Sequence, residues 1–134
     1  MILKGEGQAT AVSMANMLAM VADAPELTWQ RTAYEAASDI AASIECLERV
    51  ELLVYRGGTL AGVAIVCVDE DMHVGRCLAV QWRFVFPEHR HSSVIMELHR
   101  AVVDLTRKVG VGVLAFTQRT GLGRYQLIYK RLKE

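Results

Sequence analysis

Hydrophobic residues recur at three- and four-residue intervals in the first third of the chain, which is the spacing of one face of a helix. Between Gln8 and about Val21, the apolar positions are Val12, Met14, Met17, Leu18 and Val21. Asp23-Ala24-Pro25 interrupts the pattern, and a second apolar stripe follows at Trp29, Ala33, Ala36, Ile40, Ile44 and Leu47. The first third therefore predicts two short helices.

From Val50 onward, the pattern changes to β-branched and aromatic runs separated by glycine, which is typical of strands and tight turns. The three predicted strands are Val50–Tyr55, Leu60–Val68 and Leu78–Phe86. Gly57-Gly58 predicts a hairpin after the first strand, because glycine readily adopts the positive φ of a two-residue turn. The polar run Asp69-Glu70-Asp71 predicts the next turn, and Pro87 ends the third strand. These strands are expected to form an antiparallel meander.

The final third predicts further helices and a strand. Ser92 or Ser93 is placed to cap a helix, and Gly110 is placed to end it. The buried stripe of this helix is predicted at Val94, Ile95, Leu98, Val102, Leu105 and Val109. Next come a strand, Val111–Thr117, expected to lie parallel to Leu78–Phe86 through a right-handed crossover, and a last helix over about Leu122–Leu132. The predicted class is α/β (α+β), a mixed sheet whose meander leads into a β-α-β-α unit.

Composition narrows the class of protein. The 134 residues predict a single domain over 1–134, since domains cluster near roughly 100–150 residues. Fifteen basic residues balance fifteen acidic ones, which argues against nucleic acid as a partner, and no apolar run reaches the ~18 residues of a membrane span. Three cysteines without CxxC spacing favour a reducing, cytoplasmic compartment. A hydrophobic content of 52% with no net charge favours a homo-oligomer or a larger protein assembly.

Candidate chemistry gathers in the turn from Phe86 to Ile95, between a predicted strand and the start of a helix. A helix N-terminus presents unpaired amide N–H groups and the positive end of the helix dipole, which together bind anions. Arg90, His89 and His91 add positive or proton-donating groups. The alternative is an ordinary solvated loop. No third ligand stands near the two histidines, so no metal site is predicted, and His99 is interpreted as a solvated residue on the polar flank of the helix.

The order of elements and three sequence stretches resemble the GCN5-related N-acetyltransferase (GNAT) superfamily over roughly Val50 to Leu132. The stretches are Gly58-Thr59-Leu60-Ala61-Gly62, Val85-Phe86-Pro87-Glu88 and Tyr129-Lys130-Arg131-Leu132. In that family an Arg-x-x-Gly-x-Gly type loop holds the pyrophosphate of acetyl-CoA. Arg90 matches its first position, whereas Ser93 and Ile95 stand at the two glycine positions, where a glycine leaves room for phosphate.

The resemblance implies an acetyl transfer from acetyl-CoA to an amine, carried by a small molecule or a protein. A β-bulged splay between the strands Leu78–Phe86 and Val111–Thr117 would form the cofactor slot. The cofactor-binding residues implied are Val85, for the pantetheine, and Arg90, His91, Ser92, Ser93, Val94 and Ile95, for the pyrophosphate. Tyr129 matches the tyrosine that protonates the thiolate in many relatives, as a general acid.

Several departures from the family pattern favour a second hypothesis. Leu122 replaces the usual asparagine, and the chain stops at Glu134, before the strands that usually complete the fold. No general base can be named, because Gln81 and Arg83 cannot serve and Glu51 is interpreted as solvated. The chain would then be a GNAT-like scaffold without catalysis, with a structural or interaction role. Short chains of this kind resemble proteins encoded in tailed-phage genomes, which act in the host cytoplasm or the virion.

Overall fold

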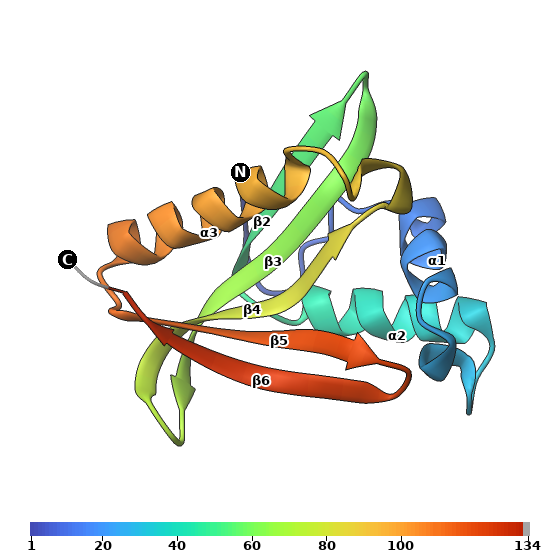
Figure 1. Ribbon diagram of the computed structural model, residues 1–134. Coiled ribbons are helices and arrows are strands. Elements are labelled where there is room, and N and C mark those ends of the chain that lie inside the picture. Colours follow the sequence, from blue (N-terminus) through green and yellow to red (C-terminus); the bar gives the residue numbers. More distant parts are fainter. Residues whose placement is uncertain (133–134) are drawn as a thin grey trace.

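The computed structural model describes residues 1–132 and shows one six-stranded mixed sheet with helices on both faces (Figure 1). The strands are β1 (Ile2–Lys4), β2 (Arg49–Arg56), β3 (Thr59–Asp71), β4 (Gly75–Val85), β5 (Val113–Gly121) and β6 (Arg124–Arg131). The helices are α1 (Met14–Ala22), α2 (Ala33–Glu45) and α3 (Val94–Val109), with short 3-10 turns η1 (Pro25–Thr28) and η2 (Pro87–His89). The sheet order follows the chain, and only β4 and β5 run parallel. The predicted mixed α/β class is confirmed.

Both N-terminal helices are confirmed, although each begins later than predicted. Ser13 caps α1 by accepting a hydrogen bond from the Asn16 N–H, and Thr32 opens α2 with a capping box. Residues before Ser13 do not continue α1, because the N–H groups of Thr10 and Ala11 donate to glutamate side chains from distant parts of the chain. Trp29 stays outside α2, and 59% of its surface is exposed.

The meander is confirmed, with one turn misplaced. The hairpin after β2 turns at Gly57 and Gly58, which have φ values of 57° and 77°. Asp69-Glu70-Asp71 does not form the next turn, because these residues pair with the start of β4 and the turn lies at 72–74. Strand β1 was not predicted, and it pairs with the start of β2.

The predicted helix over Leu122–Leu132 is wrong: this segment forms β6, paired antiparallel with β5. Gly123, at φ 66°, completes a tight turn after Leu122, so the chain reverses where a helix was expected to begin. Tyr125, Leu127 and Tyr129 then alternate along β6, which is the strand period. The three-residue spacing of Leu122, Tyr125 and Ile128 also fits a helix. The unit after the meander is therefore β-α-β-β.

Strands β4 and β5 pair only over Leu78–Val80 and Leu114–Phe116. At Gln81 the register of β4 against β3 shifts by one residue, which is a β-bulge. Beyond this bulge β4 turns away from β5 (Figure 1), and we call the opening between residues 81–85 and 117–121 the fork. A bulged, splayed strand pair was expected from the family resemblance, and the fork has this form.

Two apolar cores hold the fork from opposite faces of the sheet. Val80 packs in the core under α3, whereas Trp82 packs against the core made by α1 and α2. The buried residues of the α3 core on β4, β5 and α3 are Leu78, Val80, Leu114, Val94, Leu98, Val102 and Leu105. Because β4 contributes side chains to both cores, it cannot shift without disturbing the packing on one face of the sheet or the other.

Gly62 of β3 lies directly under α3. A Cβ at this position would come within 2.8 Å of side-chain atoms of both Val94 and Leu98. Gly62→Ala is therefore expected to displace α3 and to lower the free energy of unfolding by about 1–3 kcal/mol. Urea denaturation measures this, with Gly112→Ala as the matched control, because a Cβ at Gly112 meets no atom within 4 Å. Equal denaturation midpoints for the two variants would contradict the expectation.

Candidate functional site

The fork has a hollow on each side of β4. One, of about 370 Å³, lies between β4, β5 and the end of α1, and we call it the α1-side hollow. The other, of about 260 Å³, lies between β4 and the first turns of α3, and we call it the α3-side hollow. Arg83 and Phe84 line both. The two hollows therefore adjoin at the part of β4 that has left its partner strand.

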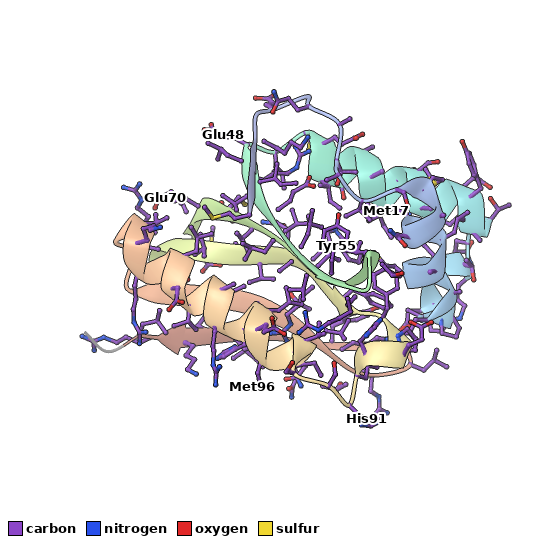
Figure 2. The ribbon with its side chains drawn as sticks, turned by 90° about the horizontal axis from the view of Figure 1, so that it is seen from above. Met17, Glu48, Tyr55, Glu70, His91 and Met96 are labelled. Carbon is purple, nitrogen blue, oxygen red and sulfur yellow. The ribbon has the colours of Figure 1, made fainter. Side chains whose placement is uncertain are left out.

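The start of α3 presents free backbone donors beside the α3-side hollow. The first hydrogen bond of the helix runs from the Glu97 N–H to the Ser93 carbonyl oxygen, at 3.0 Å. Within residues 1–132, the N–H groups of Ile95 and Met96 have no acceptor, and both side chains are exposed. Figure 2 shows Met96 on this first turn and His91 in the turn before it. These donors, at the positive end of the helix dipole, suit a phosphate or another anion.

The serines of the predicted loop bind neighbouring protein groups. Ser93 is the N-cap residue of α3 but makes no side-chain cap; its hydroxyl donates to Glu97 at 3.2 Å and accepts from Arg56. The Ser92 hydroxyl donates to the His89 carbonyl oxygen at 2.6 Å. Arg56, which sequence reasoning did not single out, also pairs with Glu97. Val94 is fully buried in the α3 core.

The Arg90 side chain is bound to groups of α1 and β4. Its two terminal nitrogens hold both carboxylate oxygens of Asp23, at 3.1 and 2.7 Å, and its Nε donates to the Val85 carbonyl oxygen at 3.0 Å. The guanidinium also lies over the Phe84 ring, 5.3 Å from its centre, which is within the ~6 Å of a cation–π contact. Arg90 therefore fastens the turn to the end of α1, and the pyrophosphate contact predicted for it stays a prediction.

Arg83 and His99 both line the α3-side hollow. The Arg83 guanidinium lies 5.1 Å from the centre of the Phe116 ring, and within residues 1–132 it has no hydrogen-bond or ion-pair partner. Partial burial lowers its pKa. His99 is half-buried, so its interpretation as a solvated residue is wrong. Burial lowers the pKa of His99, and the positive charges of Lys130 and Arg83 lower it further, which favours the neutral imidazole.

An ion pair fixes the far end of the α1-side hollow. Glu26 of η1 binds Arg119 of β5, with Nη2 and Oε1 2.9 Å apart, and accepts the Gly123 N–H at 2.8 Å. The hydrogen bond from Arg119 is the main cause that lowers the pKa of Glu26 to about 2. The Trp29 ring packs on Gly123 so closely that a Cβ there would lie 2.9 Å from it. The β5–β6 turn is thus attached to η1, which no sequence spacing indicated.

Tyr129 lies away from both hollows. Its hydroxyl donates to Asp71 Oδ2 at 2.8 Å and contacts His73 Nδ1 at 3.2 Å, near the turn between β3 and β4. Its register partner is Ala115, in the part of β5 that still pairs with β4. Burial and Asp71 raise the pKa of Tyr129. Tyr125, on the same strand, is the tyrosine that lines the α1-side hollow.

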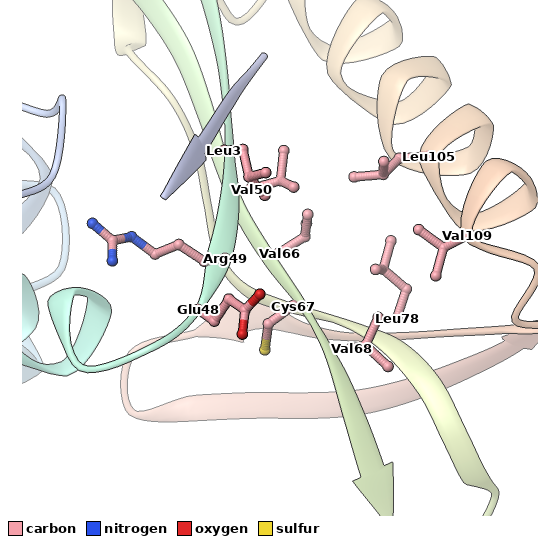
Figure 3. Close-up of a pocket in the computed structure, with 10 residues that line it drawn as sticks. All are labelled: Leu3, Glu48, Arg49, Val50, Val66, Cys67, Val68, Leu78, Leu105 and Val109. Carbon is pink, nitrogen blue, oxygen red and sulfur yellow. The ribbon is translucent and has the colours of Figure 1, made fainter. Parts of the chain in front are cut away.

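A further hollow of about 350 Å³ lies between β1, β2 and the end of α3 (Figure 3). Its walls are mostly apolar: Leu3, Val50, Val66, Val68, Leu78, Leu105 and Val109. Burial raises the pKa of the Cys67 thiol at its edge, which makes this thiol a poor nucleophile. Within residues 1–132, no three His, Cys, Asp or Glu side chains come together as a metal site needs. No helix in this described part has the length and apolarity to cross a membrane.

Two solved structures are similar to this one. The aminoglycoside 6'-N-acetyltransferase AAC(6')-IG from Acinetobacter haemolyticus, in its apo form, has a TM-score of 0.57 and 11% identity, over 84% of this chain and 79% of that chain. AAC(6')-Iy, in complex with the bisubstrate analog CoA-S-monomethyl-acetylneamine, has a TM-score of 0.54 and 15% identity, over 79% and 75%. No family model and no curated protein matches the sequence. At these identities the likeness shows the fold, which is that of the GNAT acetyltransferases.

Proposed function

We propose that the protein is an acetyl-CoA-dependent N-acetyltransferase. The observation that carries the proposal is the fork: a parallel strand pair opened by the Gln81 bulge, with free helix N–H groups on one side and a second hollow on the other. Such an opening admits two reactants from opposite faces and lets them meet at β4. One structural neighbour is in complex with a bisubstrate analog of CoA, which supports acetyl-CoA as one of the two reactants.

The α3 side suits the cofactor. The N–H groups of Ile95 and Met96 fit a pyrophosphate, together with the adjacent backbone of His91 and Ser93, whereas the N–H groups of Ser92 and Val94 already donate to the His89 carbonyl oxygen and the Ser92 hydroxyl. The backbone groups of β4 from Gln81 to Val85 have no strand partner on the β5 side, so they are free to bind the amide groups of a pantetheine arm. When bound there, acetyl-CoA supplies an activated acetyl group with a thiolate as the leaving group. Arg90 holds the turn in place through Asp23.

The residues around the α1-side hollow offer a proton donor but no carboxylate that is free to act as a base. Burial raises the pKa of the Tyr125 hydroxyl, and the charge of Glu26 raises it further, so Tyr125 keeps its proton at neutral pH and can donate it in the fork. The two carboxylates beside the α1-side hollow, Asp23 and Glu26, are both held in ion pairs. With a pKa of about 2, Glu26 is too weak a base for an ammonium group. The acceptor amine therefore loses its proton to solvent.

A charge placed at the start of α3 tests the proposal. Millimolar acetyl-CoA is expected to raise the melting temperature of the wild-type protein by several degrees, since ligand at 100 times its Kd stabilises a fold by about 2.7 kcal/mol. In Ile95→Glu this shift should disappear, because the carboxylate repels the pyrophosphate. The ligand-free fold should survive, since an acidic side chain in the first turn favours a helix.

Met14→Glu is the matched control. Met14 is an exposed apolar residue in the first turn of α1, so the variant makes the same charge change at another helix start, and it should respond to acetyl-CoA like the wild type. Absence of any wild-type shift at millimolar acetyl-CoA would instead favour the non-catalytic scaffold.

A further inference from the structure

The α1-side hollow has an apolar and aromatic wall. Its largest hydrophobic members come from α1, η1, β4 and β6: Met20, Leu27, Trp82, Phe84 and Tyr125. Trp82 and Phe84 are half-buried and are held from behind by the core of α1 and α2. A wall of this kind gains free energy by covering a flat or aliphatic group, since apolar area is removed from water on both surfaces.

The charged side chains that face this hollow from α1, η1 and β5 are already neutralised. Arg90 holds both oxygens of Asp23, and Arg119 together with the Gly123 N–H holds those of Glu26. Arg83 also lines this hollow, but its guanidinium lies over Phe116 on the α3 side. The lining therefore offers no unpaired carboxylate to an incoming ammonium group. A ligand with several ammonium groups would lose hydration there without gaining a counter-charge.

We propose that the acceptor is a small monoamine with an aromatic or aliphatic body. This proposal rests on the proposed function. The acceptor that it names differs from those in the names of the two structural neighbours, since aminoglycosides carry several ammonium groups. The volume of about 370 Å³ is near the lower end for small-molecule sites, about 300–1,000 Å³. One aromatic ring with a short amine arm fits that volume, and the amine then reaches β4 where the two hollows adjoin.

Binding of two amines, measured without acetyl-CoA, tests the proposal. The probes are 2-phenylethylamine, a monoamine, and neamine, a polyamine, and the readout is the NMR shift of the Trp82 indole N–H, assigned with Trp82→Phe. 2-Phenylethylamine is expected to shift this signal with a Kd at least tenfold below that of neamine, roughly 1.4 kcal/mol of preference. Equal or tighter binding of neamine, or no binding of 2-phenylethylamine at millimolar concentration, would overturn the proposal.

Arg119→Gln adds a charge-specific readout. This variant leaves the Glu26 carboxylate without its cation, so the preference for the monoamine should fall by about tenfold. Arg124→Gln is the control, because it removes the same charge from an exposed position outside the hollow. An unchanged preference in Arg119→Gln would overturn the charge argument.

Acetyl transfer to each amine, followed by mass spectrometry, separates the two proposals. If 2-phenylethylamine binds but acetyl-CoA neither binds nor reacts, the N-acetyltransferase function fails and the ligand class stands. If acetyl-CoA binds and neamine is the better acceptor, only the ligand class fails.

Discussion

Glu51→Ala is expected to lower the free energy of unfolding by about 3–5 kcal/mol, as removal of one partner of a buried ion pair does. Glu51 and Arg49 lie on β2 with fully buried side chains, and Arg49 Nε donates to Glu51 Oε2 at 2.8 Å. Without the carboxylate, the guanidinium would remain buried beside the core of α1 and α2 with its charge uncompensated. Since domains are stable by only about 5–15 kcal/mol, the melting temperature should fall sharply.

The loss should extend to the N-terminal segment. Glu51 also accepts hydrogen bonds from the Thr10 hydroxyl and the Ala11 N–H, at 3.0 and 2.8 Å, and Arg49 donates to the Gln8 carbonyl oxygen at 2.7 Å. The pair thus binds the segment between β1 and α1 to the sheet. Amide hydrogen exchange in Glu51→Ala should therefore rise first at Thr10 and Ala11.

Two further variants make the measurement specific. Glu48→Ala is the matched control, because Glu48 is exposed, lies one position before Arg49 and makes the same charge change when it is lost. The free energy of unfolding of this variant should change by less than about 0.5 kcal/mol. Glu51→Gln keeps an oxygen acceptor and should lose an intermediate amount. A urea midpoint for Glu51→Ala equal to that of Glu48→Ala would show that the pair contributes nothing.

The contacts of Glu51 could not be predicted from the sequence. A carboxylate among strand residues is usually solvated, and that interpretation of Glu51 is wrong because its partners Thr10 and Ala11 lie some 40 positions away in the chain. The same holds for the pairing of Glu26 with Arg119. Patterns within a strand or helix report local geometry, whereas these contacts depend on how distant elements are placed.

The fold itself was predictable where periodicity and turn chemistry agreed. Gly57-Gly58 and Gly110 take the positive φ that their predicted turn and helix end require. Helix α3 also lies where it was predicted, although Ile95 and Val109 of its predicted buried stripe are exposed. Periodicity alone was ambiguous over 122–132, where the same residues satisfy both a helical and a strand spacing. There the tertiary pairing with β5 decided the outcome.

The candidate site was predicted in outline and not in its side chains. The turn before α3 has the free N–H groups that its sequence predicts, because these follow from any helix start. Arg90 and Tyr129 carry the motif resemblance, yet their side chains bind Asp23 and Asp71. A motif fixes where a residue lies along the chain, and the partners that reach it from α1 or β3 are set by the fold.

Deletion of Gln81 is expected to close the fork while preserving the fold. Gln81 is the extra residue of the bulge: Val80 pairs with Val66 and Trp82 with Ile65. Val80 and Trp82 already belong to the cores on opposite faces of the sheet, as neighbouring residues of a regular strand do. Without Gln81, β4 can therefore continue as a regular strand with every side chain on its present face.

A regular β4 would extend its pairing with β5 beyond Val80 and Phe116, and the two hollows would no longer meet. The deletion variant should still unfold cooperatively, but the acetyl-CoA shift in melting temperature should vanish and acetyl transfer should fall at least a hundredfold, roughly the cost of a 1 Å misplacement at a reacting centre. Gln81→Ala is the control: it removes the contact with Cys67 but keeps the residue count, so the bulge and the response to acetyl-CoA should remain. A deletion variant that binds and reacts like Gln81→Ala would show that the bulge does not make the fork.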